Sequence, residues 1–161
     1  MSQEDALRPG EQRLAIAPDD DAALRFIGHI ETPFPERADC PRQGSEEGPE
    51  CTLVLKSDYA PALLGLEGFD RIEVLYWLHR ARRDLLTQNP GQDGVFRGTF
   101  SLRSPLRPNP IGTSVVRLIR AEGCRVTVRG LDCLDQTPLL DIKPYRCDYA
   151  PLAKGKNIKV K

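Results

Sequence analysis

The segment 103–118 (RSPLRPNPIGTSVVRL) holds three prolines within six residues, with polar side chains between them. Proline fixes the backbone φ angle and removes a donor, so the side chains among the prolines lose little entropy when they bind. These side chains are Arg103, Arg107 and Asn109. A rigid connection between strands is the alternative, but it requires neither two arginines nor an asparagine. The segment therefore indicates a binding role.

A second segment, 131–145 (LDCLDQTPLLDIKPY), interleaves acidic residues with apolar ones. A carboxylate in so apolar a run is costly to bury unless it finds a partner. Asp141 and Lys143 lie two apart and so share one face of a strand, where a structural ion pair is as good an interpretation as a functional one. The polar residues of interest here are Asp132, Asp135, Asp141, Lys143 and Tyr145.

Short strands, rather than helices, must position these two segments. In 124–131, Val126 and Val128 alternate with charged or polar neighbours, which predicts a half-exposed strand with a basic outer face. No glycine-rich G-x-G-x-x-G turn joins a strand to a helix, so a Rossmann fold is not expected. The sequence predicts a mainly β domain, a barrel or a sandwich, with strands in 24–32, 51–56, 71–79, 94–102, 114–120, 124–131 and 138–145, and helices only in 81–88 and near Leu63.

Composition and charge set the outline of the chain. Its 161 residues fit one domain, with an acidic leader over 1–22 that we expect to be flexible, a folded part over 23–152 and a lysine-rich tail over 153–161. Residues 1–50 hold 12 acidic and 5 basic residues, whereas 51–161 hold 11 acidic and 18 basic ones. This asymmetry is compatible with an anionic partner for the body of the protein, or with an ordinary solvated surface.

Several classes of protein are not expected. No apolar run is long enough to span a bilayer, no signal peptide opens the chain, and no membrane contact is expected. The five cysteines form no C-x-x-C pair, so we expect no metal site, and Cys124 and Cys133 are interpreted as small buried hydrophobes. We expect a soluble protein of the reducing cytoplasm.

Taken together, the two segments resemble a known family, the TrmO (YaeB, TsaA-like) tRNA methyltransferases. The resemblance rests on RPNPIG with the preceding RS, and on LD-x-x-D-x-TP-x-x-DIKPY. It is supported by FIGHIET near the start, by PRQG at 41–44 and by GLEGFDRIEVLYWLH at 65–79. These ordered motifs extend over roughly residues 26–150.

The resemblance implies a small β-barrel that acts as a homodimer, uses S-adenosylmethionine and methylates N6 of threonylcarbamoyladenosine beside the anticodon of tRNA. It also implies which residues hold the cofactor: Arg42, Gln43, Gly44, Ser45, Glu46, His79, Arg80, Arg103, Thr113, Arg129, Gly130, Leu131 and Asp132. A hydrophobic seam for the dimer is available in Val115–Ile119 and around Tyr76–Trp77.

Methyl transfer requires alignment of donor and acceptor and an acceptor for one proton, so few catalytic side chains are expected. Asn109 and Asp135 are the candidates to orient the acceptor nitrogen, although Asn109 alternatively caps a turn. His79 is either a base or a core histidine. For the substrate, Arg107 is suited to clamp the threonylcarbamoyl carboxylate, while Tyr145 and Lys143 are available for base and phosphate.

One departure from the family pattern concerns the turn at 135–138. Family members commonly read DGTP where this chain has DQTP, so a position that usually holds glycine must accept the Gln136 side chain. Two other functions stay open from the sequence. One is a methyltransferase for a small molecule or another RNA, and the other is a cofactor-binding module without turnover.

Overall fold

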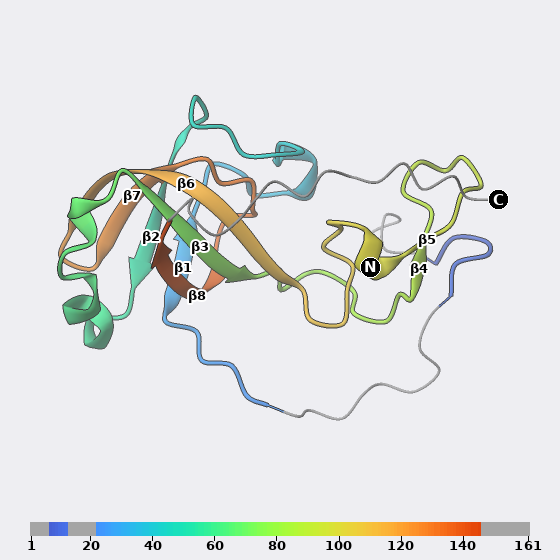
Figure 1. The fold of residues 1–161 in the computed structure, drawn as a ribbon, viewed down its shortest axis with the longest axis horizontal. Coiled ribbons are helices and arrows are strands. Elements are labelled where there is room, and N and C mark those ends of the chain that lie inside the picture. Colours follow the sequence, from blue (N-terminus) through green and yellow to red (C-terminus); the bar gives the residue numbers. More distant parts are fainter. Residues whose placement is uncertain (1–6, 13–21, 146–161) are drawn as a thin grey trace.

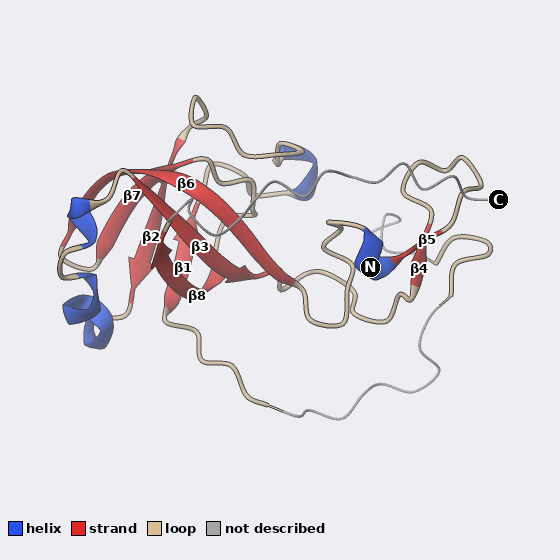
Figure 2. Cartoon of the chain, in the orientation of Figure 1, coloured by secondary structure: helices blue, strands red, loops and turns tan. Residues whose placement is uncertain are grey.

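The computed structural model describes residues 7–12 and 22–145 of the chain. Its main body is a closed barrel of six antiparallel strands, visible as the arrows at the left of Figure 1 and in red in Figure 2. This confirms the predicted barrel and excludes a Rossmann fold. Around the barrel, the strands follow the order β1 (Gly28–Glu31), β2 (Glu50–Leu55), β7 (Arg125–Arg129), β6 (Ile111–Glu122), β3 (Arg71–Trp77) and β8 (Thr137–Pro144).

Alternation of apolar and polar residues produces the barrel, because successive side chains of a strand point to opposite faces. In β3, Ile72, Val74 and Tyr76 are buried while the residues between them are half-buried. Strand β2 follows the same rule, with Cys51, Leu53 and Leu55 inside. Tyr76 therefore belongs to the core and cannot contribute to the predicted hydrophobic seam on the outside.

Short 3-10 helices lie in the connections between the barrel strands. Helix η3 (Ser57–Leu63) and helix η4 (Leu66–Gly68) link β2 to β3, and Leu63 is buried in the core with Tyr59 and Leu66 packed against it. Helix η2 (Arg37–Asp39) lies in the long loop between β1 and β2. Within the described residues, no helix is long and apolar enough to cross a membrane.

Residues 81–110 leave the barrel and form a separate lobe, at the right of Figure 1. The lobe contains a two-stranded sheet of β4 (Thr87–Gln88) and β5 (Arg97–Gly98), followed by helix η5 (Thr99–Ser101). The N-terminal stretch lies beside it: the Leu86 amide donates to the Gln12 carbonyl (2.8 Å), and the Gln12 amide donates to Thr87 Oγ1 (2.9 Å).

Two predicted elements are wrong, and both fall in the lobe. The helix predicted over 81–88 is an irregular segment that ends in β4, and the strand predicted over 94–102 is reduced to the two residues of β5, followed by η5. A buried threonine explains the second error, because Thr99 bonds to the backbone of the facing segment and bends the chain there. The apolar periodicity of 94–102 does not reveal that contact.

Further predictions from the sequence concern the turn at 135–138, two cysteines and the termini. Gln136 has a φ angle of 62°, so the turn at 135–138 does place a side chain in the left-handed region that favours glycine. Cys133 is buried as predicted, whereas Cys124 is only partly buried. The proposed boundaries at 22/23 and 152/153 stay predictions, and the lysine-rich tail lies outside the described residues.

Candidate functional site

The loop that carries PRQG meets the end of β7 at a direct contact between two backbones. A Cβ atom placed on Gly44 would lie 1.8 Å from the Gly130 carbonyl oxygen and 3.2 Å from the Leu131 nitrogen. No side chain fits at that distance, so only glycine lets the two segments touch. The structure thus brings together two groups of the predicted cofactor residues that are separated by more than 80 positions in the sequence. We call this contact the glycine junction.

Ion pairs hold both segments of the glycine junction. Arg71 at the start of β3 donates two hydrogen bonds to the Glu46 carboxylate, at 2.7 and 3.1 Å, and this lowers the pKa of the Glu46 carboxyl group. On the other segment, Arg129 Nη2 donates to Glu50 Oε1 at 3.1 Å. The carboxylate of Glu46 therefore stays ionised and paired at neutral pH, which keeps the loop against the barrel.

One atom of the glycine junction lacks a partner. Arg129 Nε is buried and has no hydrogen-bond acceptor within the described residues. A buried donor without an acceptor costs about 1–3 kcal/mol, so such a group in a folded protein calls for an explanation. One explanation is that a ligand supplies the acceptor atom for Arg129 Nε. In the same region Arg42 and Gln43 are exposed and form no hydrogen bond with other described residues, which leaves their donors available.

Behind the junction, Asp132 is fixed by a buried tyrosine. Tyr76 Oη donates to Asp132 Oδ1 (3.1 Å) and lies 2.9 Å from Ser114 Oγ, which then acts as the donor to Tyr76. Burial raises the pKa of Tyr76 well above its ordinary value, and the Asp132 charge adds to this rise. Burial raises the pKa of the Cys40 thiol, at the entry to PRQG, and the charge of Asp132 raises it further. Asp132 is therefore near Cys40.

The ring of Tyr76 packs closely against a second glycine, Gly112. A Cβ atom on Gly112 would lie 2.2 Å from the ring, so β6 can approach β3 closely only at a glycine. One residue further, Thr113 Oγ1 donates to Glu73 Oε1 (2.9 Å) on the outer face. Thr113 is therefore on the opposite face of β6 from the interior that Tyr76 occupies.

His79 and Arg80 follow the end of β3 and are exposed. Arg80 Nη1 lies 3.6 Å from Glu36 Oε2 beside η2, which links the end of β3 to the loop that leads into PRQG. Partial burial lowers the pKa of His79, and the charge of Arg80 lowers it further. His79 is therefore neutral at physiological pH and able to accept a proton, and it is not a core residue.

The proline-rich segment belongs mostly to the lobe. Arg103 is exposed and has no hydrogen bond or ion pair with other described residues, and Arg107 Nη1 donates weakly to the Leu102 carbonyl at 3.4 Å. Asn109 is exposed, and its carbonyl accepts from the Ile111 amide (2.8 Å) while its side chain caps no turn. The side-chain amide of Asn109 is thus available to a ligand.

Asp135 has a different environment from Asn109. Asp135 Oδ1 accepts a hydrogen bond from the Thr32 amide (3.0 Å), and the Asp135 amide donates to the Phe34 carbonyl (2.8 Å). These contacts tie the 133–137 turn to the segment after β1. On β8, Lys143 and Asp141 form the ion pair that the sequence left open, and the Tyr145 amide donates to the Arg71 carbonyl (3.1 Å).

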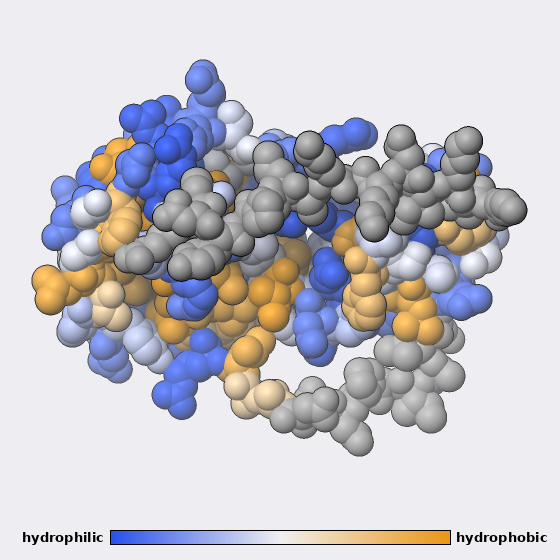
Figure 3. All heavy atoms as spheres, viewed as in Figure 1, coloured by the Kyte–Doolittle hydropathy of each residue, from blue (hydrophilic) through white to orange (hydrophobic). Residues whose placement is uncertain are grey.

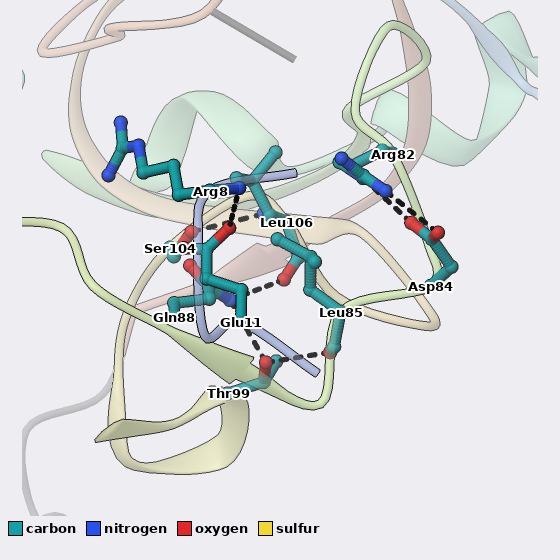
Figure 4. A network of polar contacts seen from close by, with 9 residues as sticks. All are labelled: Arg8, Glu11, Arg82, Asp84, Leu85, Gln88, Thr99, Ser104 and Leu106. Atoms are coloured by element: carbon teal, nitrogen blue, oxygen red, sulfur yellow. Dashed lines mark hydrogen bonds and ion pairs between the residues drawn. The ribbon is translucent and has the colours of Figure 1, made fainter. Parts of the chain in front are cut away.

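The sequence did not point to a polar network inside the lobe. Gln88 is buried and donates to Thr99 Oγ1 (3.0 Å) and to the Leu106 carbonyl (2.7 Å), and Thr99 Oγ1 donates to the Leu85 carbonyl (2.7 Å), as Figure 4 shows. Arg82 pairs with Asp84 in the same view. Because the sequence predicts a helix over 81–88, it gives no indication of this network. The unusual residue in that range is Gln88, a polar side chain that the structure buries.

The N-terminal stretch completes the lobe. Glu11 accepts from the amides of Arg8 and Asn89, each at 3.0 Å, and Arg8 Nη1 donates to the Asn89 carbonyl at 2.6 Å. A cavity of about 160 Å³ lies between this stretch, η2 and the lobe. Its wall includes Arg8, Arg37 and Arg82. Residues 8–12 of the expected flexible leader thus have defined partners.

The chain was compared with known proteins. Residues 29–149 match the family model described as "tRNA-methyltransferase O N-terminal domain". A "Probable S-adenosyl-L-methionine-binding protein VirR" from Rhizobium radiobacter is 54% identical over 147 residues, which cover 91% of this chain and 84% of that protein. A "tRNA (adenine(37)-N6)-methyltransferase" from Mus musculus is 37% identical over 131 residues, which cover 76% of this chain and 30% of that enzyme.

Solved structures agree with these relatives. The crystal structure of TrmO from Pseudomonas aeruginosa matches with a TM-score of 0.70 and 34% identity, over 87% of this chain and 62% of that one. The chain therefore spans less than two thirds of that structure, and about a third of the mouse enzyme.

The glycine junction makes a prediction about stability. Gly44→Ala should destabilise the protein by about 1–3 kcal/mol, because the added methyl group collides with the Gly130 carbonyl and the loop must shift. Gly68→Ala is the matched control, since no atom lies within 4 Å of its added Cβ. Urea denaturation followed by circular dichroism measures both. Equal midpoints for the two variants would contradict the contact.

Proposed function

Because this chain belongs to the family of the tRNA-methyltransferase O N-terminal domain, we propose that it transfers a methyl group from S-adenosyl-L-methionine to N6 of an adenosine in tRNA. The more specific form of the proposal is that the adenosine carries a threonylcarbamoyl group and lies next to the anticodon. The observation that supports it most is the glycine junction, which joins two of the motifs on which the family resemblance rests.

The residues at the glycine junction fit such a cofactor. The unpaired Arg129 Nε–H requires an acceptor, and S-adenosylmethionine offers acceptors in its carboxylate, ribose and adenine. The Gly130 and Leu131 backbone is buried against Gly44, and Asp132 is held by Tyr76 so that its second carboxylate oxygen is free to accept from a ligand. When bound, the cofactor supplies an activated methyl group on a sulfonium.

The chain's own residues then serve the acceptor. Of the two candidates to orient N6, Asn109 is the better placed, because its side chain is exposed and has no partner in the described structure. Asp135 is already engaged by the Thr32 amide, which favours a role in holding the turn. A neutral His79 is available to take up the proton that leaves the nitrogen. Arg107 retains N–H donors for a substrate carboxylate, and Lys143 and Tyr145 remain the proposed contacts to phosphate and base.

A homodimer is part of the proposal. Strand β6 presents Ile111, Val115 and Ile119 on its outer face, each with about two fifths of its surface exposed, and Trp77 lies opposite Ile111 in the register. These residues form an apolar stripe that a second copy of the chain would cover. The seam differs from the one expected from sequence, because Tyr76 and Val116 are buried in the core and Ile111 is added.

The direct test incubates the purified chain with S-adenosylmethionine and tRNA from a strain that lacks the gene, and then analyses the nucleosides by mass spectrometry. We expect one added methyl group on threonylcarbamoyladenosine. Asn109→Ala should lower turnover by about 100-fold, because acceptor orientation and proton loss depend on it. Asp135→Ala should lower the melting temperature more than the turnover.

Three results would contradict this account. A turnover of Asn109→Ala within a few-fold of the wild type would remove its catalytic role. A methyl group on an unmodified nucleoside or a small molecule would change the acceptor. Binding of S-adenosylmethionine without methylation of any nucleoside would instead favour the cofactor-binding module, a function in line with the name of the Rhizobium radiobacter relative.

Substrate discrimination is predicted to depend on Arg107. Lysine keeps the charge but cannot donate two parallel hydrogen bonds to a carboxylate, so Arg107→Lys should reduce kcat/KM for tRNA with the threonylcarbamoyl group by about tenfold or more. Binding of tRNA without the modification should change little. Arg25→Lys, an exposed arginine before β1, is the control. An equal loss on both tRNAs would show that Arg107 contacts only the RNA backbone.

A further inference from the structure

Helix η5 presents an aromatic ring to solvent on a rigid mount. Phe100 is 81% exposed, whereas its neighbour Thr99 is buried. The Thr99 amide donates to the Leu86 carbonyl (3.0 Å), and its hydroxyl lies within hydrogen-bond distance of both the Gln88 amide and the Leu85 carbonyl. Ser101 Oγ closes the turn on the Gly98 carbonyl at 2.8 Å. The backbone under the ring is therefore fixed although the ring itself has almost no packing.

Arginines without acidic partners flank the ring. Arg97 lies three residues before Phe100 and Arg103 three residues after it, and both are exposed. Arg97 donates only to the Val95 carbonyl (3.3 Å), and Arg103 has no polar partner among the described residues. The stretch 95–107 holds three arginines and no acidic residue. We call Arg97, Phe100 and Arg103 the η5 surface.

Several arginines on the strands of the barrel do have acidic partners. There, Arg71, Arg125 and Arg129 each form an ion pair with a glutamate. In the described part of the lobe only Arg82 has a carboxylate partner, while Arg83 stacks on Trp77 at 5.3 Å and donates to the Pro108 carbonyl. Among the described residues, the lobe thus holds several arginines without a carboxylate partner, next to the exposed hydrophobic residues that Figure 3 shows there in orange.

We propose that the η5 surface is an RNA contact: Phe100 stacks on an unpaired base of a single-stranded loop, and Arg97 and Arg103 bind the phosphates on either side. For Arg103 this replaces the cofactor role that the family resemblance implies. Unpaired bases stack on aromatic side chains whatever their sequence, and arginines supply the charge. This inference rests on the proposed function in that the RNA is then the substrate tRNA. It adds which part of the chain grips the loop.

A second copy of the chain is a poorer occupant of this surface. A stable dimer buries about 800 Å² on each partner, whereas one phenylalanine contributes about 150–250 Å². The η5 surface also offers a partner positive charge without a matching carboxylate, which is unfavourable for a like-charged lobe from another copy. Single-stranded RNA suits both the exposed ring and the positive charge, because it is a polyanion whose unpaired bases expose aromatic faces.

Fluorescence anisotropy with a labelled anticodon stem–loop RNA tests this proposal on the full chain. Phe100→Ala should weaken binding by about 5-fold to 100-fold, the typical loss of one stacked base, and Phe100→Trp should restore it. The control is Leu64→Ala, which removes a residue that is 92% exposed and follows η3, outside the lobe. Arg97→Gln should reduce the slope of log affinity against log salt by about 0.7, as expected for one phosphate contact, whereas Arg25→Gln should leave it unchanged.

Two results would overturn the η5 surface as an RNA contact. One is wild-type affinity in Phe100→Ala together with an unchanged KM for tRNA methylation, which would leave the proposed function intact. The other is a change from dimer to monomer in light scattering of Phe100→Ala, which would assign the surface to a second copy. Failure of the wild type to methylate tRNA, combined with loss of RNA binding in Phe100→Ala, would support the surface and refute the proposed function.

Discussion

The contact between Gly44 and Gly130 is the constraint on which the candidate site depends. It joins a loop that follows β1 to the end of β7, and it does so with two backbones at a distance that excludes any side chain. Because the barrel is closed, the ends of its strands cannot move independently, so this contact fixes the loop relative to the whole core. Around it lie the Glu46–Arg71 pair, the unpaired Arg129 Nε and the Asp132–Tyr76 hydrogen bond.

The barrel and the lobe differ in how their charged and polar groups are paired. In the barrel, Arg71, Arg125 and Arg129 pair with glutamates, and the barrel fixes the residues proposed to hold the cofactor. The lobe is held by side-chain hydrogen bonds from Gln88 and Thr99 instead of an extended sheet. Its unpaired arginines and exposed Phe100 are suited to a polyanion, which supports the proposal that the lobe contacts RNA while the barrel holds the cofactor.

Sequence reasoning succeeded where local alternation decides structure and failed where distant contacts decide it. The buried positions of β2 and β3 follow from simple alternation, so the barrel was predictable, although in β7 Thr127 is buried between Val126 and Val128. In the lobe, a buried Gln88 and Thr99 override the local pattern, and their partners lie up to 18 residues away. The role of Arg8 and Glu11 depends on contacts near residue 89, which no pattern within the first 22 residues indicates.

The candidate site shows the same division. Gly44 and Gly130 were assigned to one site only by family resemblance, since neither spacing nor periodicity relates PRQG to the end of β7. Tyr76 and Ser114, which fix Asp132, were missed because a tyrosine in an alternating strand is typical of a core residue. Asn109 and Asp135 looked equivalent in the sequence, and only their hydrogen bonds separate an available amide from an engaged carboxylate.

The most direct test of the glycine junction as the cofactor site is hydrogen–deuterium exchange with and without S-adenosylhomocysteine, the demethylated form of the cofactor. S-adenosylhomocysteine should slow exchange in the peptides that cover 41–46 and 129–132, while exchange in the peptide that contains η3 should be unchanged. Slower exchange confined to the lobe cavity, with no change at the glycine junction, would contradict the assignment of the cofactor to this junction.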